Sequence, residues 1–321
     1  MELQLHDIGP IFGHETARAD FLAAMEAGRL HHGWLIRGPR GVGKARLALR
    51  FAMRLLGDRT DLSSSPDPAV TRLVLAGSHP DLRVIRRPID DKGKPKAEIP
   101  VDSVRELSEF FALRPALGGW RVAIIDAVDE MNRFGANAVL KTLEEPPSRA
   151  VLFLVAHGEQ AVLPTIRSRC RVLRCGGLAE RDERAVLAQA GYVGAKAEET
   201  ASLAPGRPGR AISLLQDDAN AAGASIAALL RADSPDASAL QGAMSQAARS
   251  DAALAISLEH LRTYLHKRAL REAEPAVAGD WADAALAVAR IGAEATALNQ
   301  DRAQTLAAAL QAVALRVSLG A

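Results

Sequence analysis

The sequence predicts an α/β domain built on a mostly parallel sheet, followed by helices alone. Three observations predict it. Strand-like and helix-like segments alternate through the first 175 residues, a glycine-rich loop joins one such strand to a helix, and strand signals stop after Cys175-Gly176-Gly177. Only 4% of the residues are aromatic and the second half is rich in alanine, which favours packed helices over a β-sandwich. Strands alternating with helices imply right-handed crossovers, with helices on both faces of the sheet.

Short apolar runs mark five expected strands, and those in the middle of the domain are apolar throughout, as in strands buried on both faces. They cover residues 34–36, 82–85, 122–125, 151–155 and 170–173. Apolar periodicity and punctuating residues predict helices between them, over residues 45–56, 101–113 with Asp102 or Ser103 as N-cap, 132–145 ended by Pro146-Pro147, and 163–169. Two polar stretches, residues 58–68 and 86–100, are expected to be surface loops, and the second carries Lys92, Lys94 and Lys96.

Helical patterns alone continue after the last strand. A small unit of three helices is expected over residues 179–190, 195–203 and 210–216. Longer helices are expected over residues 256–270, 281–298 and 301–319, and a polar break at 232–236 separates helices within this last region.

Length and composition limit the class of protein. A chain of 321 residues exceeds one ordinary compact domain, and a net charge of +2 argues against a protein that coats nucleic acid. The two cysteines, Cys170 and Cys175, form no zinc-type cluster and fit a reduced compartment. The first ten residues lack a secretory pattern, and no apolar stretch approaches the ~18–20 residues that span a bilayer. We therefore expect a soluble, cytoplasmic protein.

The main chemical signal is the loop from Gly38 to Lys44, which also contains Gly41 and Gly43. Glycines let backbone N–H groups surround an anion without a Cβ clash. The start of the following helix and Lys44 add positive charge, so the pattern predicts a phosphate-binding loop. The alternative is a glycine-rich turn with a surface lysine.

Two residues that phosphoryl transfer needs are missing from this site. Ala45 stands where a serine or threonine hydroxyl coordinates Mg²⁺. Asp126 ends the third strand and could orient a metal, but Ala127 stands where many motor ATPases place a glutamate that activates water. Since a general base contributes ~10²–10⁴-fold, hydrolysis at a useful rate is not expected. Glu130, one turn further, is interpreted as a surface or helix-start residue.

Arg167 and Arg169 lie between the fourth and fifth expected strands. In phosphoryl-transfer assemblies an arginine supplied by a neighbouring subunit neutralises charge on the transferring phosphate, which is worth ~10³–10⁵-fold in rate. On spacing alone, a surface salt bridge is the commoner explanation for either residue.

Four segments closely resemble bacterial clamp-loader AAA+ subunits: residues 28–44, 77–81, 131–147 and 168–170, which lie within residues 8–175. The defective ATP site resembles that of the family's delta-prime members, and differs from that of the ATP-hydrolysing gamma/tau members. The resemblance implies an AAA+ P-loop domain over residues 1–175, a small helical lid over 176–217 and a helical collar, used for oligomerisation, over 218–321.

The resemblance also implies a function. Such a subunit of the DNA polymerase III clamp loader joins gamma/tau and delta subunits in a hetero-oligomeric ring, and helps place the sliding clamp on primed DNA. Arg169 would enter the ATP site of a neighbouring gamma/tau subunit. No membrane partner is implied.

No cofactor is expected to be required, and ATP or ADP would bind at most weakly through Gly38, Gly41, Gly43, Lys44 and Asp126. Many relatives carry four zinc-binding cysteines between the phosphate loop and the second strand. Residues 54–79 contain none, so no zinc is expected. Gly209 stands where active members carry a nucleotide-sensing arginine, with Arg210 beside it.

Two other functions remain open from the sequence. One is a self-sufficient AAA+ ATPase of the gamma type. The other is a DNA-binding protein that uses Arg83, Arg86, Arg87 and the nearby lysines.

Overall fold

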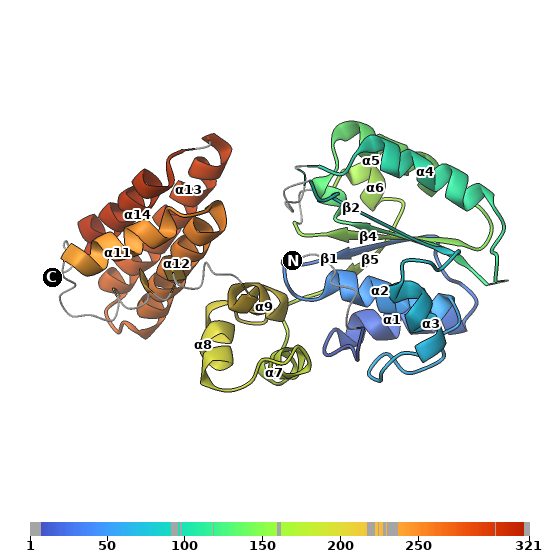
Figure 1. Cartoon of the computed structure of the whole chain (residues 1–321), viewed down its shortest axis with the longest axis horizontal. Coiled ribbons are helices and arrows are strands. Elements are labelled where there is room, and N and C mark those ends of the chain that lie inside the picture. Colours follow the sequence, from blue (N-terminus) through green and yellow to red (C-terminus); the bar gives the residue numbers. More distant parts are fainter. Residues whose placement is uncertain are drawn as a thin grey trace. The chain divides into compact units, whose positions relative to one another are not determined.

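The computed structural model describes residues 8–90, 96, 98–117, 119–158, 162–216, 222–223, 225–226, 229, 237–298 and 300–317. The chain forms two compact units, Met1–Ala211 and Ile212–Ala321, and each has a core of its own (Figure 1). Lys92, Lys94, the polar break at 232–236 and the expected lid–collar boundary after residue 217 lie outside the described residues.

The first unit contains one all-parallel sheet with strand order β2-β3-β4-β1-β5. The strands are β1 (Gly33–Arg37), β2 (Leu82–Arg86), β3 (Arg121–Asp126), β4 (Ala150–Ala156) and β5 (Arg171–Arg174). Each of the five expected strands is present, with both ends within one residue of the prediction. Because all strands run the same way, the loops that follow β1, β3 and β4 meet at one edge of the sheet.

Helices cover both faces of this sheet (Figure 1). One face carries α1 (Glu15–Glu26), α2 (Lys44–Leu55) and α3 (Pro68–Leu75), and the other carries α4 (Val101–Ala112), α5 (Arg133–Glu144) and α6 (Pro164–Arg167). Trp34 and Ile36 belong to the first core and Leu35 to the second, as the twofold alternation of strand side chains requires. The predicted fold class, an α/β domain with a parallel sheet covered by helices on both faces and followed by helices alone, is confirmed.

The helices differ from the predictions in three places. The helix α1 was not predicted, because only Ala17, Phe21 and Ala24 are buried along it and its apolar period is weak. The helix α3 was also missed, although Asp67 accepts hydrogen bonds from the backbone N–H groups of the first turn. The prediction of Asp102 or Ser103 as a cap is wrong, since α4 begins directly after Pro100.

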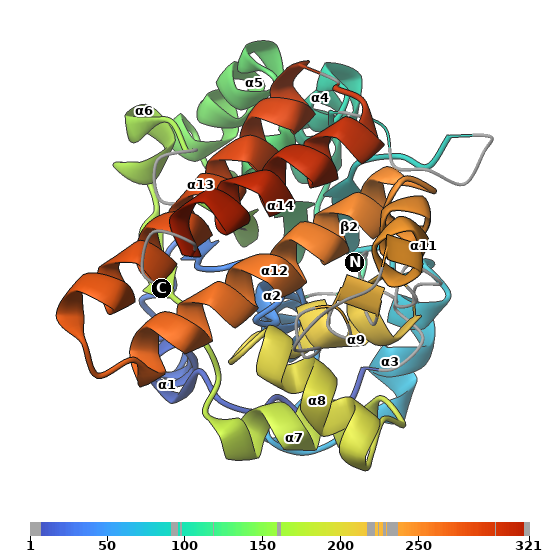
Figure 2. The same ribbon diagram turned by 90° about the vertical axis from the view of Figure 1, so that its left-hand side faces the viewer.

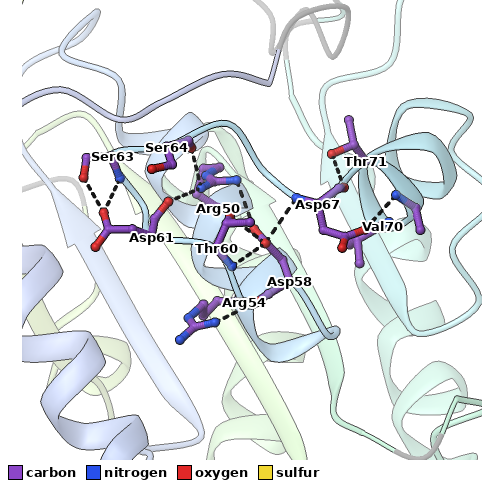
Figure 3. Close-up of polar contacts among 11 residues, drawn as sticks. Arg50, Arg54, Asp58, Thr60, Asp61, Ser63, Ser64, Asp67, Val70 and Thr71 are labelled. Carbon is purple, nitrogen blue, oxygen red and sulfur yellow. Dashed lines mark hydrogen bonds and ion pairs between the residues drawn. The ribbon is translucent and has the colours of Figure 1, made fainter.

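The polar stretch after α2, expected to be a simple surface loop, is anchored by a buried ion pair (Figure 3). Arg50 Nη1 lies 3.0 Å from Asp58 Oδ2, and both side chains are 0% exposed. Arg50 Nη2 also donates to the carbonyl oxygens of Asp61 and Ser64, each at 3.0 Å. Asp58 Oδ1 accepts from the Thr60 hydroxyl and from backbone N–H groups. These contacts hold residues 58–67 against α2.

Three short helices follow the sheet: α7 (Glu180–Gln189), α8 (Ala195–Leu203) and α9 (Pro208–Gln216). The buried Glu183 accepts a hydrogen bond from the backbone N–H of Gly206 at 3.0 Å, which joins α7 to the turn before α9. All three agree with the predicted small helical unit, and the boundary between the two compact units falls inside α9.

The second unit is helical in its described part. It contains α11 (Ala237–Ala247), α12 (Asp251–Arg271), α13 (Pro275–Leu298) and α14 (Arg302–Val317). These helices share a core that includes Leu261, Leu265 and Leu306, and Figure 2 shows α13 lying alongside α14. Within the described part of the chain, no helix is long and apolar enough to cross a membrane.

Candidate functional site

The loop between β1 and α2 has the backbone geometry that its glycines predicted. A Cβ at Gly38 would lie 1.9 Å from the carbonyl oxygen of Cys175, so only glycine allows this approach to the end of β5. Gly41 and Gly43 have φ of +90° and +97°, in the left-handed region that favours glycine. Gly43 is also the N-cap residue of α2. The predicted strand–loop–helix arrangement is therefore confirmed.

Lys44 folds back over this loop. Its Nζ donates to the carbonyl oxygens of Gly38 and Pro39, each at 2.7 Å, and the side chain is buried. Burial lowers the pKa of Lys44 to about 8, although the charges of Cys175, Asp126 and Asp129 act in the opposite direction. The lysine is thus positioned at the loop, as predicted, and its charge is poorly solvated.

Asp126 ends β3 on the same edge of the sheet. Burial raises the pKa of Asp126 to about 6, the negative charge of Glu130 adds to the rise, and Lys44 opposes it. Ala45 and Ala127 bring no ligand atom to this edge, and Ala127 is buried. This edge of the sheet therefore carries the expected Lys44 and Asp126. It has no hydroxyl at position 45 and no second carboxylate at position 127.

Asp129 and His157 belong to this edge as well, and the sequence analysis missed both. Asp129 Oδ2 accepts a hydrogen bond from the backbone N–H of His157 at 2.9 Å. Burial, and then the charge of Lys44, lower the pKa of His157 to about 4, so the ring is neutral at physiological pH. Asp129 follows β3 and His157 follows the neighbouring strand β4. Polar residues directly after adjacent parallel strands are typical of binding sites, so this pattern could have identified both from the sequence.

Glu130 is more than a surface or helix-start residue. Its carboxylate forms ion pairs with Arg40 Nη2 at 2.8 Å and with Arg87 Nε at 2.7 Å. Arg40 belongs to the phosphate loop and Arg87 follows β2. Glu130 therefore joins the phosphate loop to the segment after β2, the outermost strand on that side of the sheet.

The start of α9 contacts the phosphate loop directly. The backbone N–H of Gly209 donates to the carbonyl oxygen of Gly41 at 2.8 Å. A Cβ at Gly41 would lie 2.8 Å from the backbone nitrogen of Arg210. The segment that the resemblance linked to nucleotide sensing thus lies against the loop, with Gly209 and Arg210 both in its first turn.

Arg169 lies just before β5, at the edge of the sheet where the parallel strands begin, opposite the edge that carries the phosphate loop. Its Nη2 is 2.9 Å from Glu144 Oε1, and its Nη1 donates to the carbonyl oxygen of Thr165 at 3.1 Å. The five residues of β1 span ~16 Å between this edge and the phosphate loop. Arg167 ends α6 as an exposed residue. Neither arginine is brought to the chain's own loop.

Comparison with known proteins is consistent with these features. A family model described as "DNA polymerase III, delta subunit" matches residues 13–178, more than half of the chain. DNA polymerase III subunit delta' of Pseudomonas aeruginosa is 39% identical over 145 residues, covering 45% of this chain and 43% of the relative. The Escherichia coli subunit of that name is 33% identical over 206 residues, covering 63% of this chain and 60% of the relative.

DNA polymerase III subunit gamma/tau of Mycobacterium tuberculosis is 33% identical over 181 residues, covering 56% of this chain and 30% of the relative. The chain thus matches between 43% and 60% of the length of the two delta' relatives, and less of the gamma/tau relative.

Proposed function

The chain belongs to the DNA polymerase III delta-subunit family, and from this premise we propose that it is a delta-prime subunit of a bacterial clamp loader. In this role it hydrolyses no ATP of its own, joins gamma/tau and delta subunits in a cytoplasmic ring, and helps place the sliding clamp on primed DNA. It donates Arg169 to the ATP site of an adjacent gamma/tau subunit.

The observation that carries this proposal is the position of Arg169. Because the sheet separates it from the loop at Lys44 by ~16 Å, its guanidinium cannot reach a phosphate bound at that loop. It is 38% exposed at the surface, where a second subunit has access to it. An arginine used in phosphoryl transfer from this position would have to act in trans.

The chain's own loop supports the other half of the proposal. Ala45 offers no oxygen to a magnesium ion, and Ala127 offers no base to a water molecule. Gly38, Gly41, Gly43, Lys44 and Asp126 remain, so ATP or ADP would bind weakly and stay intact. We propose that no cofactor, zinc included, is required.

The test is Arg169→Ala in a clamp loader reconstituted with this chain. If Arg169 acts in trans, one phase of the single-turnover ATPase time course slows by ~10³-fold or more, because one ATP site loses its stabilising cation. The other phases and the assembly of the complex, followed by gel filtration, should not change. An unaltered time course would contradict the trans role.

Lys44→Ala is the matched control, since it changes the loop lysine of the chain's own site. We expect it to alter clamp-dependent ATPase by less than about twofold, because this loop does not turn over ATP. The alternative function, a self-sufficient ATPase, predicts ATP turnover by the purified chain that Lys44→Ala abolishes.

A further inference from the structure

Arg169 lies where three distant segments of the chain meet, all at the edge of the sheet opposite the phosphate loop. They are residues 31–33 at the start of β1, residues 143–145 at the end of α5 and residues 165–170 around the end of α6. A Cβ at Gly33 would lie 2.7 Å from Leu143 Cδ2 and 3.2 Å from the carbonyl oxygen of Arg169. The backbone of Arg169 is therefore closely packed before its side chain makes any contact.

His32 holds the end of α5 in this cluster. Its ring Nε2 lies 3.0 Å from the carbonyl oxygen of Leu143, and because a carbonyl only accepts, Nε2 carries the proton. Burial, and then the neighbouring charge of His31, lower the pKa of His32, so the neutral donor form is favoured. The last turn of α5 is thus attached to the start of β1.

Glu144 is the last residue of α5, and its carboxylate faces Arg169. The C-terminal end of a helix carries partial negative charge, so this place attracts a cation even before Glu144 is counted. The guanidinium uses Nη2 for Glu144 and Nη1 for Thr165 O and, at 3.5 Å, the Ser168 hydroxyl. Within the described part of the chain it has no other partner, so its remaining N–H groups can still donate.

We propose that Glu144 is a positioning residue for Arg169: it holds the guanidinium in one orientation in which the remaining donors meet the phosphate of the neighbouring subunit's ATP. This inference rests on the trans role of Arg169. An arginine already ordered loses less conformational freedom when it inserts, and a small misplacement in such a site costs rate. Glu144 and Arg169 are 50% and 38% exposed, so their ion pair adds little to folding stability.

The experiment compares Glu144→Gln with Glu145→Gln in the reconstituted clamp loader. Both residues are exposed carboxylates at the end of α5, but only Glu144 contacts Arg169. The Arg169-dependent phase of ATP hydrolysis should slow by ~10-fold in Glu144→Gln, with KM for ATP unchanged. In Glu145→Gln it should change by less than about twofold. Thermal unfolding and complex assembly should be the same for both variants.

The double variant Arg169→Ala with Glu144→Gln separates positioning from any other effect. If Glu144 acts through Arg169, the double variant is no slower than Arg169→Ala alone. A slower double variant, or equal rates for Glu144→Gln and Glu145→Gln, would overturn the positioning role while leaving the trans role intact. If Arg169→Ala itself has no effect, the proposed function fails, and the role of Glu144 fails with it.

Discussion

At the scale of single residues, burial disfavours the charged forms of two opposite groups at the same edge of the sheet. It raises the pKa of Asp126 to about 6 and lowers the pKa of Lys44 to about 8. Their mutual attraction opposes both shifts but does not cancel them. Burying these charged groups lowers the free energy of unfolding, and the size of this loss depends on pH.

The variant Asp126→Asn tests that dependence. The folded pKa of Asp126 lies above the ordinary value of 3.8, so the neutral form stabilises the fold below pH 3.8 and this contribution is lost as pH rises through about 6. At neutral pH the variant should be more stable than the wild type by up to ~3 kcal/mol, and the difference should vanish near pH 3.8. Urea unfolding across this pH range measures it, and a less stable variant at neutral pH would contradict the burial argument.

The buried pair of Arg50 and Asp58 leads to a second residue-scale prediction. Asp58→Ala leaves the Arg50 guanidinium buried without its counter-charge and should lower the free energy of unfolding by ~3–5 kcal/mol. Asp61→Ala is the control, since the side chain of Asp61 is 65% exposed and should cost less than ~1 kcal/mol. Equal losses in the two variants would show that burial of the pair does not decide its contribution.

At the scale of elements, the strands were predicted better than the helix starts. The run Val122–Ile125 within β3 is apolar on both faces, and the position of the strand follows from that run alone. The start of α4 could not be predicted from the local sequence in this way. Asp102 and Ser103 are good capping residues, but both lie inside the helix. Capping preference is a local effect of ~1 kcal/mol, and packing of Val104 and Leu107 on the sheet outweighs it.

Gly33 gives the element-scale prediction, since it is the point where β1 meets the end of α5 and the segment before β5. Gly33→Ala would force Leu143 Cδ2 and the Arg169 backbone to move, which should cost ~1–3 kcal/mol in the free energy of unfolding. The variant Gly176→Ala is the control, because a Cβ there meets nothing within 4 Å. Denaturant unfolding of both variants decides whether the close approach at Gly33 is tight.

At the scale of the whole molecule, most of the arginines suggested for DNA binding already have partners. Arg87 forms an ion pair with Glu130, and the Arg83 guanidinium lies 5.8 Å from the centre of the Phe110 ring. The net charge of the chain is only +2. These facts weigh against a protein that binds duplex DNA by itself.

We therefore predict that the purified chain binds duplex DNA no more tightly than ~10⁻⁶ M at physiological salt, the range of non-specific binding. Fluorescence anisotropy with a labelled duplex measures this directly. Nanomolar binding that weakens steeply between about 50 and 200 mM salt would instead support the DNA-binding alternative.

Local patterns were enough to predict the order of the five strands, the phosphate loop and the absence of a hydroxyl at Ala45, because these depend on local periodicity and on residue types within a few positions. Which distant residues meet depends on the tertiary fold. It brought Asp129 and His157 to the loop edge and joined Glu144 to Arg169, and it buried Arg50 against Asp58. The first two pairs join residues from different strands and helices, so their contact depends on strand order and helix packing, which no local pattern encodes. The third pair lies 8 residues apart and depends on how the loop after α2 folds back onto that helix.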